Sequence, residues 1–208
     1  RSRQLGVLPS AGAVMRMPAD GTDLDDVKRW SLVAWLTAKK VGAGTTLLSL
    51  KDRTKERLVV KLAAGCGGRA LEVIFPDGKS VVQTDCAHLL SKDRWSFVAV
   101  VQDSKARRIS VDGLAATAAG SSALFGGAGK NERVLQLTDT AAVGWAALYG
   151  RAMTRADVQG QRGAGPVVWL DGAVLASYEG RKGVPRDLAA YHNRATAGAT
   201  DHVTAHAG

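Results

Sequence analysis

The chain has 208 residues, of which 46% are hydrophobic, a content that excludes a disordered chain and suffices for one large packed domain. No apolar run approaches the ~18 residues that a membrane-spanning helix needs, so we expect a soluble protein without membrane insertion. Lysine and arginine total 28 against 19 aspartate and glutamate, and the resulting net charge of +9 favours polyanionic partners such as nucleic acid or sulfated glycans.

The first 26 residues predict a short strand and an acidic loop. Val7-Leu8 or Val14-Met15 is expected to form an edge strand. The following loop has four carboxylates in seven residues, and Ca²⁺ prefers oxygen ligands, so the loop raises the hypothesis of a calcium site. The spacing does not match an EF-hand, and a solvated loop is the simpler interpretation. The calcium candidates are Asp20, Asp23, Asp25 and Asp26.

Residues 30–37 predict a strand covered on both faces. Leu32, Ala34 and Leu36 alternate with Val33 and Trp35, so both faces are apolar. Further strands are expected at 45–50 and 58–64, joined by a charged hairpin loop at 51–56. A glycine-rich turn follows at 65–68, which lacks the Gly-Lys-Ser/Thr ending of a phosphate-binding loop.

Residues 71–75 and 80–84 predict a hairpin across Pro76-Asp77-Gly78-Lys79, whose residues suit turn positions. The two cysteines of the chain, Cys66 and Cys86, lie at strand ends within this region. A disulfide between them and a pair of free thiols are both compatible with the pattern.

The stretch Arg94 to Gly113 predicts the central hairpin of a sheet. In the first strand, Trp95, Phe97, Ala99 and Val101 share one face, and Val98 and Val100 share the other, so both faces are covered. In the second strand, Ile109 and Val111 point inward while Arg108, Ser110 and Asp112 point outward. The strand closes on Asp112-Gly113, a strong hairpin signal, and the next strand is expected at 114–117.

The remainder of the central region predicts a small-residue loop at 118–129, a strand at 134–137 and a strand at 142–149. Thr154 is a candidate helix N-cap, and Asp157 is placed to complete a capping box, which predicts a short helix through Gln159.

Three segments together resemble laminin G-like domains, which share the concanavalin A-like jelly-roll sandwich. The central hairpin ends in Val-Asp-Gly as the family hairpin does, Arg29 to Lys40 resembles the early family strand, and Ala141 to Val158 resembles the late strand and its helix. The resemblance covers about residues 20–160. It implies an all-β, antiparallel jelly-roll sandwich.

The C-terminal part is ambiguous. Residues 167–178 predict one more hairpin, and the domain is expected to span 1–178 with an extension at 179–208. Glu179-Gly180, Asp187 to Ala189 and His192-Asn193 resemble elements that open a laminin G-like unit. Either a truncated second repeat begins here, or the sandwich is permuted and the tail supplies a strand to it.

The sequence shows no catalytic pattern. It contains no Gly-x-Ser-x-Gly elbow and no paired acids on one strand of the kind used by glycosidases of this fold, so we expect no enzyme activity and no cofactor other than the calcium considered above. The tryptophans lie mostly in alternating apolar strands, so packing rather than sugar stacking is expected.

These observations predict a non-catalytic binding or structural module that mediates protein interaction. Its charge and its tail favour a subunit of a larger organellar, for example mitochondrial, or ribonucleoprotein assembly. The alternative is an extracellular lectin-like domain that binds carbohydrate or sulfated glycan. The polyanion-binding candidates are Arg107, Arg108, Arg181, Lys182 and Arg186.

Overall fold

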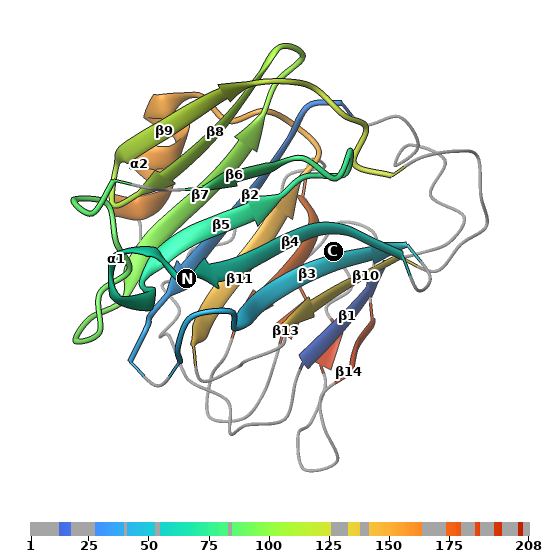
Figure 1. The fold of residues 1–208 in the computed structure, drawn as a ribbon. Helices are drawn as coiled ribbons and strands as arrows, with labels where there is room; N and C mark the ends of the chain where they lie inside the picture. The colour runs from blue at the N-terminus through green and yellow to red at the C-terminus, as the bar shows by residue number, and fades with distance from the viewer. Residues whose placement is uncertain are drawn as a thin grey trace.

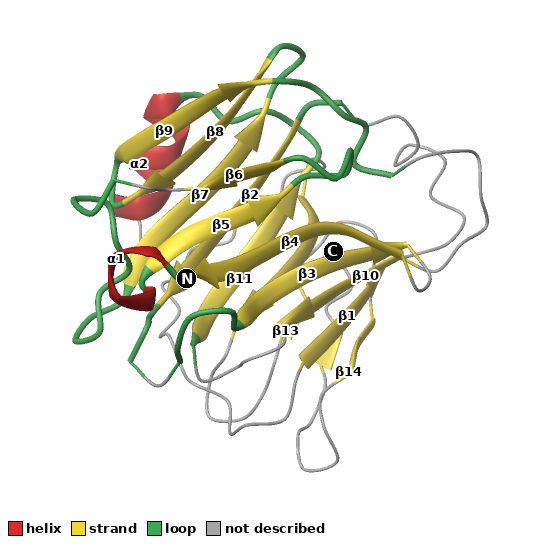
Figure 2. Cartoon of the chain, viewed as in Figure 1, coloured by secondary structure: helices red, strands yellow, loops and turns green. Residues whose placement is uncertain are grey.

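The structure is a computed structural model of the chain, and two antiparallel β-sheets stacked as a sandwich make up most of it (Figure 1). It describes residues 13–17, 28–39, 41–52, 55–82, 85–125, 133–137, 142–163, 174–179, 186–187, 194–196 and 204–205. The predicted fold class, an all-β antiparallel jelly-roll sandwich, is confirmed. The described residues also include two short helices, drawn in red in Figure 2.

The first sheet has seven strands and the second has six. In spatial order, the first contains β14 (Arg194–Thr196), β1 (Ala13–Met17), β10 (Arg133–Leu137), β3 (Thr46–Asp52), β4 (Lys55–Ala63), β5 (Ala70–Ile74) and β6 (Ser80–Val82). The second contains β12 (Val174–Glu179), β11 (Val143–Tyr149), β2 (Trp30–Leu36), β7 (Ser96–Gln102), β8 (Ala106–Val111) and β9 (Leu114–Ala119). A separate parallel pair joins β13 (Arg186–Asp187) to β15 (Thr204–Ala205).

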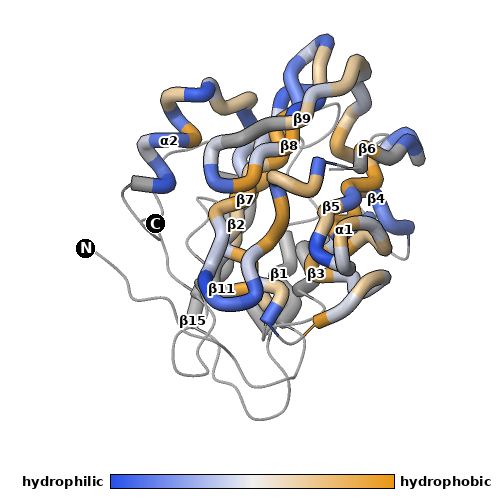
Figure 3. Tube along the Cα trace, turned by 60° about the vertical axis from the view of Figure 1, so that its left-hand side comes forward, coloured by the Kyte–Doolittle hydropathy of each residue, from blue (hydrophilic) through white to orange (hydrophobic). Residues whose placement is uncertain are grey.

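The main core fills the space between the two sheets. The inward residues of β2 and β7 alternate as predicted, with Leu32, Ala34, Val98 and Val100 all buried in this core. Facing them are buried leucines and valines of β3, β4 and β5, and Trp30 is fully buried among them. In Figure 3, most of the orange, hydrophobic segments lie in the strands of the sandwich, whereas the turns and α2 contain blue, hydrophilic segments.

A second apolar cluster covers the outer face of the six-stranded sheet. Val33, Phe97, Ala99 and Val101 pack there against Met153 and Val158, of which the latter belongs to α2 (Arg155–Gly163). Both faces of β2 and β7 are therefore covered, as their sequences predict. No helix within the described residues is long and apolar enough to cross a membrane.

The predicted capping box at the start of α2 is confirmed. The Thr154 N–H donates to Asp157 Oδ2 at 2.8 Å, and the Asp157 N–H donates to Thr154 Oγ1 at 3.1 Å. These bonds satisfy two N–H groups that a helix start leaves unpaired. The helix extends to Gly163, four residues beyond the predicted end, and Gln161 in this extension is buried.

One local prediction is corrected by the structure. The charged segment 51–56 is not a long loop, since β3 continues to Asp52 and β4 begins at Lys55. Ion pairs across the strand ends, Lys51 to Glu56 at 4.0 Å and Arg57 to Asp52 at 3.6 Å, accompany this extension. The glycine-rich turn is a single short turn, α1 (Gly65–Gly68), in which Cys66 has a φ of 54° and Gly67 a φ of 71°.

The C-terminal segment contributes strands to both sheets. β12 pairs with β11, and β14 pairs with β1. Of the two strand positions predicted near the N-terminus, Val14-Met15 lies in β1, and Val7-Leu8 lies outside the described residues. The division of the chain at residue 178 stays a prediction, although the tail strands join the sheets of this same chain.

Cys66 and Cys86 form a disulfide, so the alternative of two free thiols is wrong. Their Cα atoms are 5.5 Å apart, across a separation of 20 residues. The bond joins α1 to the connector between β6 and β7, where Leu90 is fully buried and its N–H donates to the Arg69 carbonyl at 3.1 Å. The disulfide thereby links this connector to the turn between β4 and β5 of the seven-stranded sheet.

Arg107 joins the two sheets at the opposite end of the sandwich. It is 1% exposed, and its guanidinium forms an ion pair with Asp77 in the β5–β6 turn and lies 4.5 Å from the Phe75 ring centroid. Its Nη2 also donates to Ser122 Oγ at 3.2 Å, and Ser122 Oγ donates to Gln102 Oε1 at 3.2 Å. A Cβ at Gly120, whose φ is 143°, would lie 3.0 Å from Arg107 Cζ, so a larger residue there would be strained.

Removing the disulfide is expected to destabilise the fold. The double variant Cys66→Ser/Cys86→Ser should lose about 3 kcal/mol of unfolding free energy, because the bond closes a loop of this length in the unfolded chain. Urea denaturation of the wild type with and without reductant, beside the double variant, measures the loss. Equal stability of the oxidised wild type and the variant would contradict the prediction.

Removing the Asp77 charge is expected to leave the buried Arg107 guanidinium without its ion pair. Asp77→Asn should lower the free energy of unfolding by about 2 kcal/mol, below the usual loss for a buried pair because the Asp77 side chain is 28% exposed. Asp93→Asn, the same change at an exposed side chain, is the control and should have little effect. A similar loss in both variants would exclude a special role for the Arg107 pair.

The stabilising effect of Asp77 should also depend on pH. Burial alone would raise the pKa of Asp77, but hydrogen bonds from Arg107 and from the Lys79 N–H, together with the guanidinium charge, hold it below 3.8. The contribution of the ion pair is therefore present above pH 3.8 and is lost as the pH falls through the lowered pKa. The stability difference between wild type and Asp77→Asn should vanish in acid.

Candidate functional site

Aromatic residues meet on the outer face of the six-stranded sheet, at the end of the sandwich that holds α1. Trp35 lies opposite Phe97 in the β2–β7 register, and their ring centroids are 5.3 Å apart. Phe97 is 1% exposed, whereas Trp35 is only half-buried. On the other side of Trp35, the register places Trp145 opposite it. Aromatic residues therefore occupy neighbouring positions on three adjacent strands.

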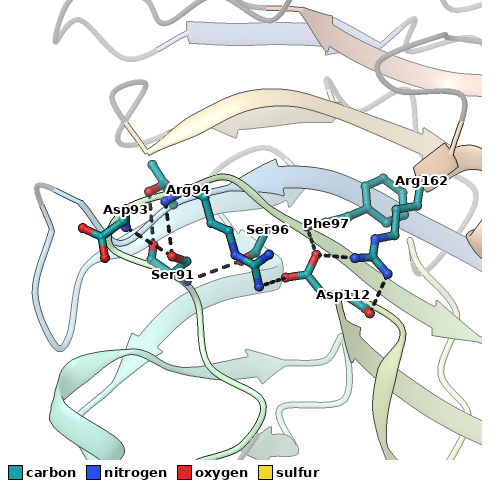
Figure 4. A network of polar contacts seen from close by, with 8 residues as sticks. Ser91, Asp93, Arg94, Ser96, Phe97, Asp112 and Arg162 are labelled. Atoms are coloured by element: carbon teal, nitrogen blue, oxygen red, sulfur yellow. Dashed lines mark hydrogen bonds and ion pairs between the residues drawn. The ribbon is translucent and has the colours of Figure 1, made fainter.

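The connector before β7 brings Arg94 and Trp95 to the same end of the sheet. Its turn is organised by Ser91, whose Oγ accepts hydrogen bonds from the Asp93 N–H and the Arg94 N–H, both at 3.2 Å (Figure 4). Ser96 Oγ in turn accepts from the Ser91 N–H at 3.3 Å. Trp95 is half-buried and lies between Arg94 and Ser96, the first residue of β7.

Asp112 is the centre of the polar part of this site. Its backbone has a φ of 52° and the next residue, Gly113, has a φ of 94°, as the two-residue turn between β8 and β9 requires. Its Oδ1 accepts a hydrogen bond from the Phe97 N–H at 3.1 Å. The turn therefore fixes the carboxylate beside the aromatic residues.

Two arginines flank Asp112 from different elements. Arg162, from the last turn of α2, donates from Nη1 to the Asp112 carbonyl at 2.7 Å and lies 3.5 Å from its Oδ1 (Figure 4). Arg94 approaches Oδ2 only to 4.0 Å, and its side chain is 74% exposed. Arg162 is therefore fixed by direct hydrogen bonding, whereas Arg94 remains available to solvent.

We call this group the aromatic–arginine patch: Trp35, Trp95, Arg94, Asp112 and Arg162. It combines half-buried tryptophans with guanidinium donors and a carboxylate acceptor. Aromatic faces pack against apolar C–H surface, and the polar groups hydrogen-bond hydroxyl or anionic groups beside it. The arrangement suits a ligand with an apolar face and a polar rim.

The structure corrects one of the predicted polyanion-binding residues. Arg107 points between the sheets and is paired with Asp77, so it is unavailable to a surface ligand. Arg108 is half-buried and donates to the Met153 carbonyl at 2.8 Å. Arg181 and Lys182 lie outside the described residues, and of Arg186 only the backbone, in β13, is described.

The predicted calcium ligands are not described by the structure. Asp20, Asp23, Asp25 and Asp26 all lie in the segment 18–27, outside the described residues, so the calcium hypothesis stays a prediction. Among the residues that are described, no group of three or more histidine, cysteine, aspartate or glutamate side chains is arranged to hold a metal ion.

Sequence reasoning missed part of the patch. It assigned the tryptophans to core or semi-buried packing, which agrees with the fully buried Trp30 and the half-buried Trp35 and Trp95. Arg94 stands directly before Trp95, and an arginine beside a tryptophan at the start of a strand could have indicated a candidate binding surface. No sequence pattern indicated a role for Arg162, because it lies beyond the predicted end of the helix and 50 residues from Asp112.

Comparisons with known proteins give a fold and no family. No family model matches the chain, and no curated protein matches it. Among solved structures, a Bacteroides ovatus protein named as a candidate carbohydrate-binding protein is similar over 94% of this chain and 59% of its own, with 14% identity and a TM-score of 0.57. This chain thus spans less than two thirds of that protein.

Two further structures are similar with lower scores. Domain 4 of a GH43 extracellular arabinanase from Geobacillus stearothermophilus, solved with arabinotriose, has 13% identity and a TM-score of 0.46 over 64% of this chain and 66% of its own. Domains LG4-5 of the mouse laminin alpha1 chain have 16% identity and a TM-score of 0.42 over 75% and 46%. At 14% identity, the likeness to the Bacteroides ovatus protein is one of fold alone.

Proposed function

We propose that this chain is a non-catalytic glycan-binding module and that the aromatic–arginine patch is its binding surface. The observation that carries the proposal is that Arg94 and Arg162 both approach Asp112, on the sheet face that carries the half-buried Trp35. The half-buried Trp95 directly follows Arg94 in the chain. A pyranose ring has an apolar C–H face and a rim of hydroxyl groups, which matches an aromatic surface bordered by donors and an acceptor. The fold likeness to a candidate carbohydrate-binding protein supports the proposal.

Arg94 is the residue best placed to contact a ligand first. It is highly exposed, and its 4.0 Å approach to Asp112 Oδ2 is too long for a strong hydrogen bond. A ligand oxygen that takes this guanidinium disrupts only a weak exposed ion pair, which costs little. Asp112 keeps its bond to the Phe97 N–H, so its carboxylate stays in place.

Catalysis is not part of the proposal. The patch contains one carboxylate, Asp112, which is engaged by a backbone N–H and approached by two arginines. Hydrolysis of a glycosidic bond by the usual mechanism needs two acids facing each other ~5–10 Å apart. A binding role requires only the aromatic surface and the hydrogen-bonding groups that are present.

The alternative, a subunit of an organellar or ribonucleoprotein assembly, rests on the net charge of +9 and on the tail. The tail gives less support to such an assembly, because β12 and β14 pair with strands of this chain. The Cys66–Cys86 disulfide favours an oxidising compartment, which suits the extracellular alternative better. The assembly therefore stays a prediction of the sequence.

Trp95→Ala and Arg94→Ala test the proposed surface. We expect the wild type to bind glycans on an array, and each variant to bind the best of them about tenfold more weakly in calorimetry, because each removes a principal contact. Lys105→Ala is the matched control, since it removes an exposed positive charge from the β7–β8 turn, at the other end of these strands, and should bind as the wild type does.

The result that would overturn the proposal is equally clear. If the wild type binds no glycan, the module is not a lectin, and if all three variants bind equally well, the ligand occupies another surface. Thermal unfolding of each variant shows whether a loss of binding reflects a loss of fold.

Two variants of Asp112 distinguish the role of this residue in the turn from the role of its negative charge. Asp112→Asn keeps an oxygen for the Phe97 N–H and tolerates the positive φ, so we expect stability near that of the wild type but altered glycan affinity. Asp112→Ala loses the hydrogen bond and strains the turn, so it should cost about 2 kcal/mol of unfolding free energy. Equal stability of the two variants in urea denaturation would contradict this assignment.

A further inference from the structure

Among the described residues, no further strand pairs with the outer side of β9. It is the last strand of the six-stranded sheet and pairs with β8 through six consecutive residue pairs without a register shift. Figures 1 and 2 show it at the outer margin of the sandwich. Its sequence, LAATAA, has no charge and no proline. Natural edge strands usually carry charges, proline or a bulge that prevent pairing with another strand.

The turn geometry determines which backbone groups of β9 face outward. Asp112 and Gly113 form a two-residue turn, so Val111 and Leu114 exchange the first pair of hydrogen bonds. Antiparallel ladders alternate hydrogen-bonded and non-hydrogen-bonded pairs. The N–H and C=O groups of Ala115, Thr117 and Ala119 therefore point away from β8.

We propose that β9 pairs antiparallel with β9 of a second copy of this chain, about a two-fold axis at Thr117. The three outward-facing residues are symmetric about Thr117, so Ala115 faces Ala119 of the other copy and every free group finds a partner. The side chains that meet are short and uncharged, and Thr117 is exposed. A two-fold axis closes the assembly at two copies.

The rest of the sandwich is consistent with pairing through this sheet. β6, the corresponding edge strand of the other sheet, has only three residues and offers a much shorter ladder. Pairing of β9 therefore extends the six-stranded sheet across two chains, and the aromatic–arginine patches of both copies lie on that continuous sheet. The ladder does not include any residue of the patch.

Sedimentation velocity of the purified chain tests the dimer. The wild type should show a species of twice the 21.7 kDa of one chain whose fraction rises with concentration. Thr117→Lys places two like charges opposite each other and should give a monomer, whereas Thr117→Ser keeps the size and the backbone N–H and should still dimerise. Thermal unfolding of both variants verifies that the sandwich remains folded.

A second variant keeps the test decisive if lysine disturbs the fold. Thr117→Pro removes an outward N–H that β8 does not use, a change that an edge strand accepts. It should also give a monomer. A wild type that remains at the mass of one chain up to its solubility limit overturns the proposal, as does a dimer that persists in both Thr117→Lys and Thr117→Pro.

Discussion

The structure depends on the burial of β2 and β7 on both faces. Their inner residues form the core between the sheets, but Val33, Phe97 and Val101 on the outer face would remain in water without a further element. The segment around Met153 and the helix α2 supply that cover. This requirement determines where α2 lies, and the position of α2 brings Arg162 to Asp112. Burial of the outer face of β2 and β7 thus positions Arg162, one residue of the aromatic–arginine patch.

The two ends of the sandwich use charged residues in different ways. At one end, Arg107 is withdrawn from solvent and ties the β5–β6 turn to β8, with its Nε left unpaired and its ring partner Phe75 beside it. At the other end, Arg94 is exposed and weakly paired. The ion pair holds the two sheets together because its loss would leave the buried Arg107 guanidinium without its charged partner. An exposed arginine keeps its hydrogen-bonding capacity for a ligand.

Local patterns predicted most of the strands, because alternation, Asp-Gly turns and a capping box act over a few residues. The same alternation places Arg107 inward, two positions before Ile109, yet its charge led to the prediction of an exposed ligand contact. Its partner Asp77 is 30 residues away, in a different hairpin, and no local pattern links the two. The strand order of the seven-stranded sheet was equally inaccessible, because β1, β10 and β3 are neighbours in space and distant in sequence.

That strand order has a consequence for the order of folding. β1 lies between β10 and β14, so its backbone groups have no strand partner until residues 133–137 are available, more than a hundred residues later. The β7–β8 and β8–β9 hairpins, by contrast, close across turns of a few residues. Long-range pairing is slow because a large loop must close first. We therefore expect the central hairpins to form early and the seven-stranded sheet to be completed last, with β1 exposed to cellular chaperones in the interval.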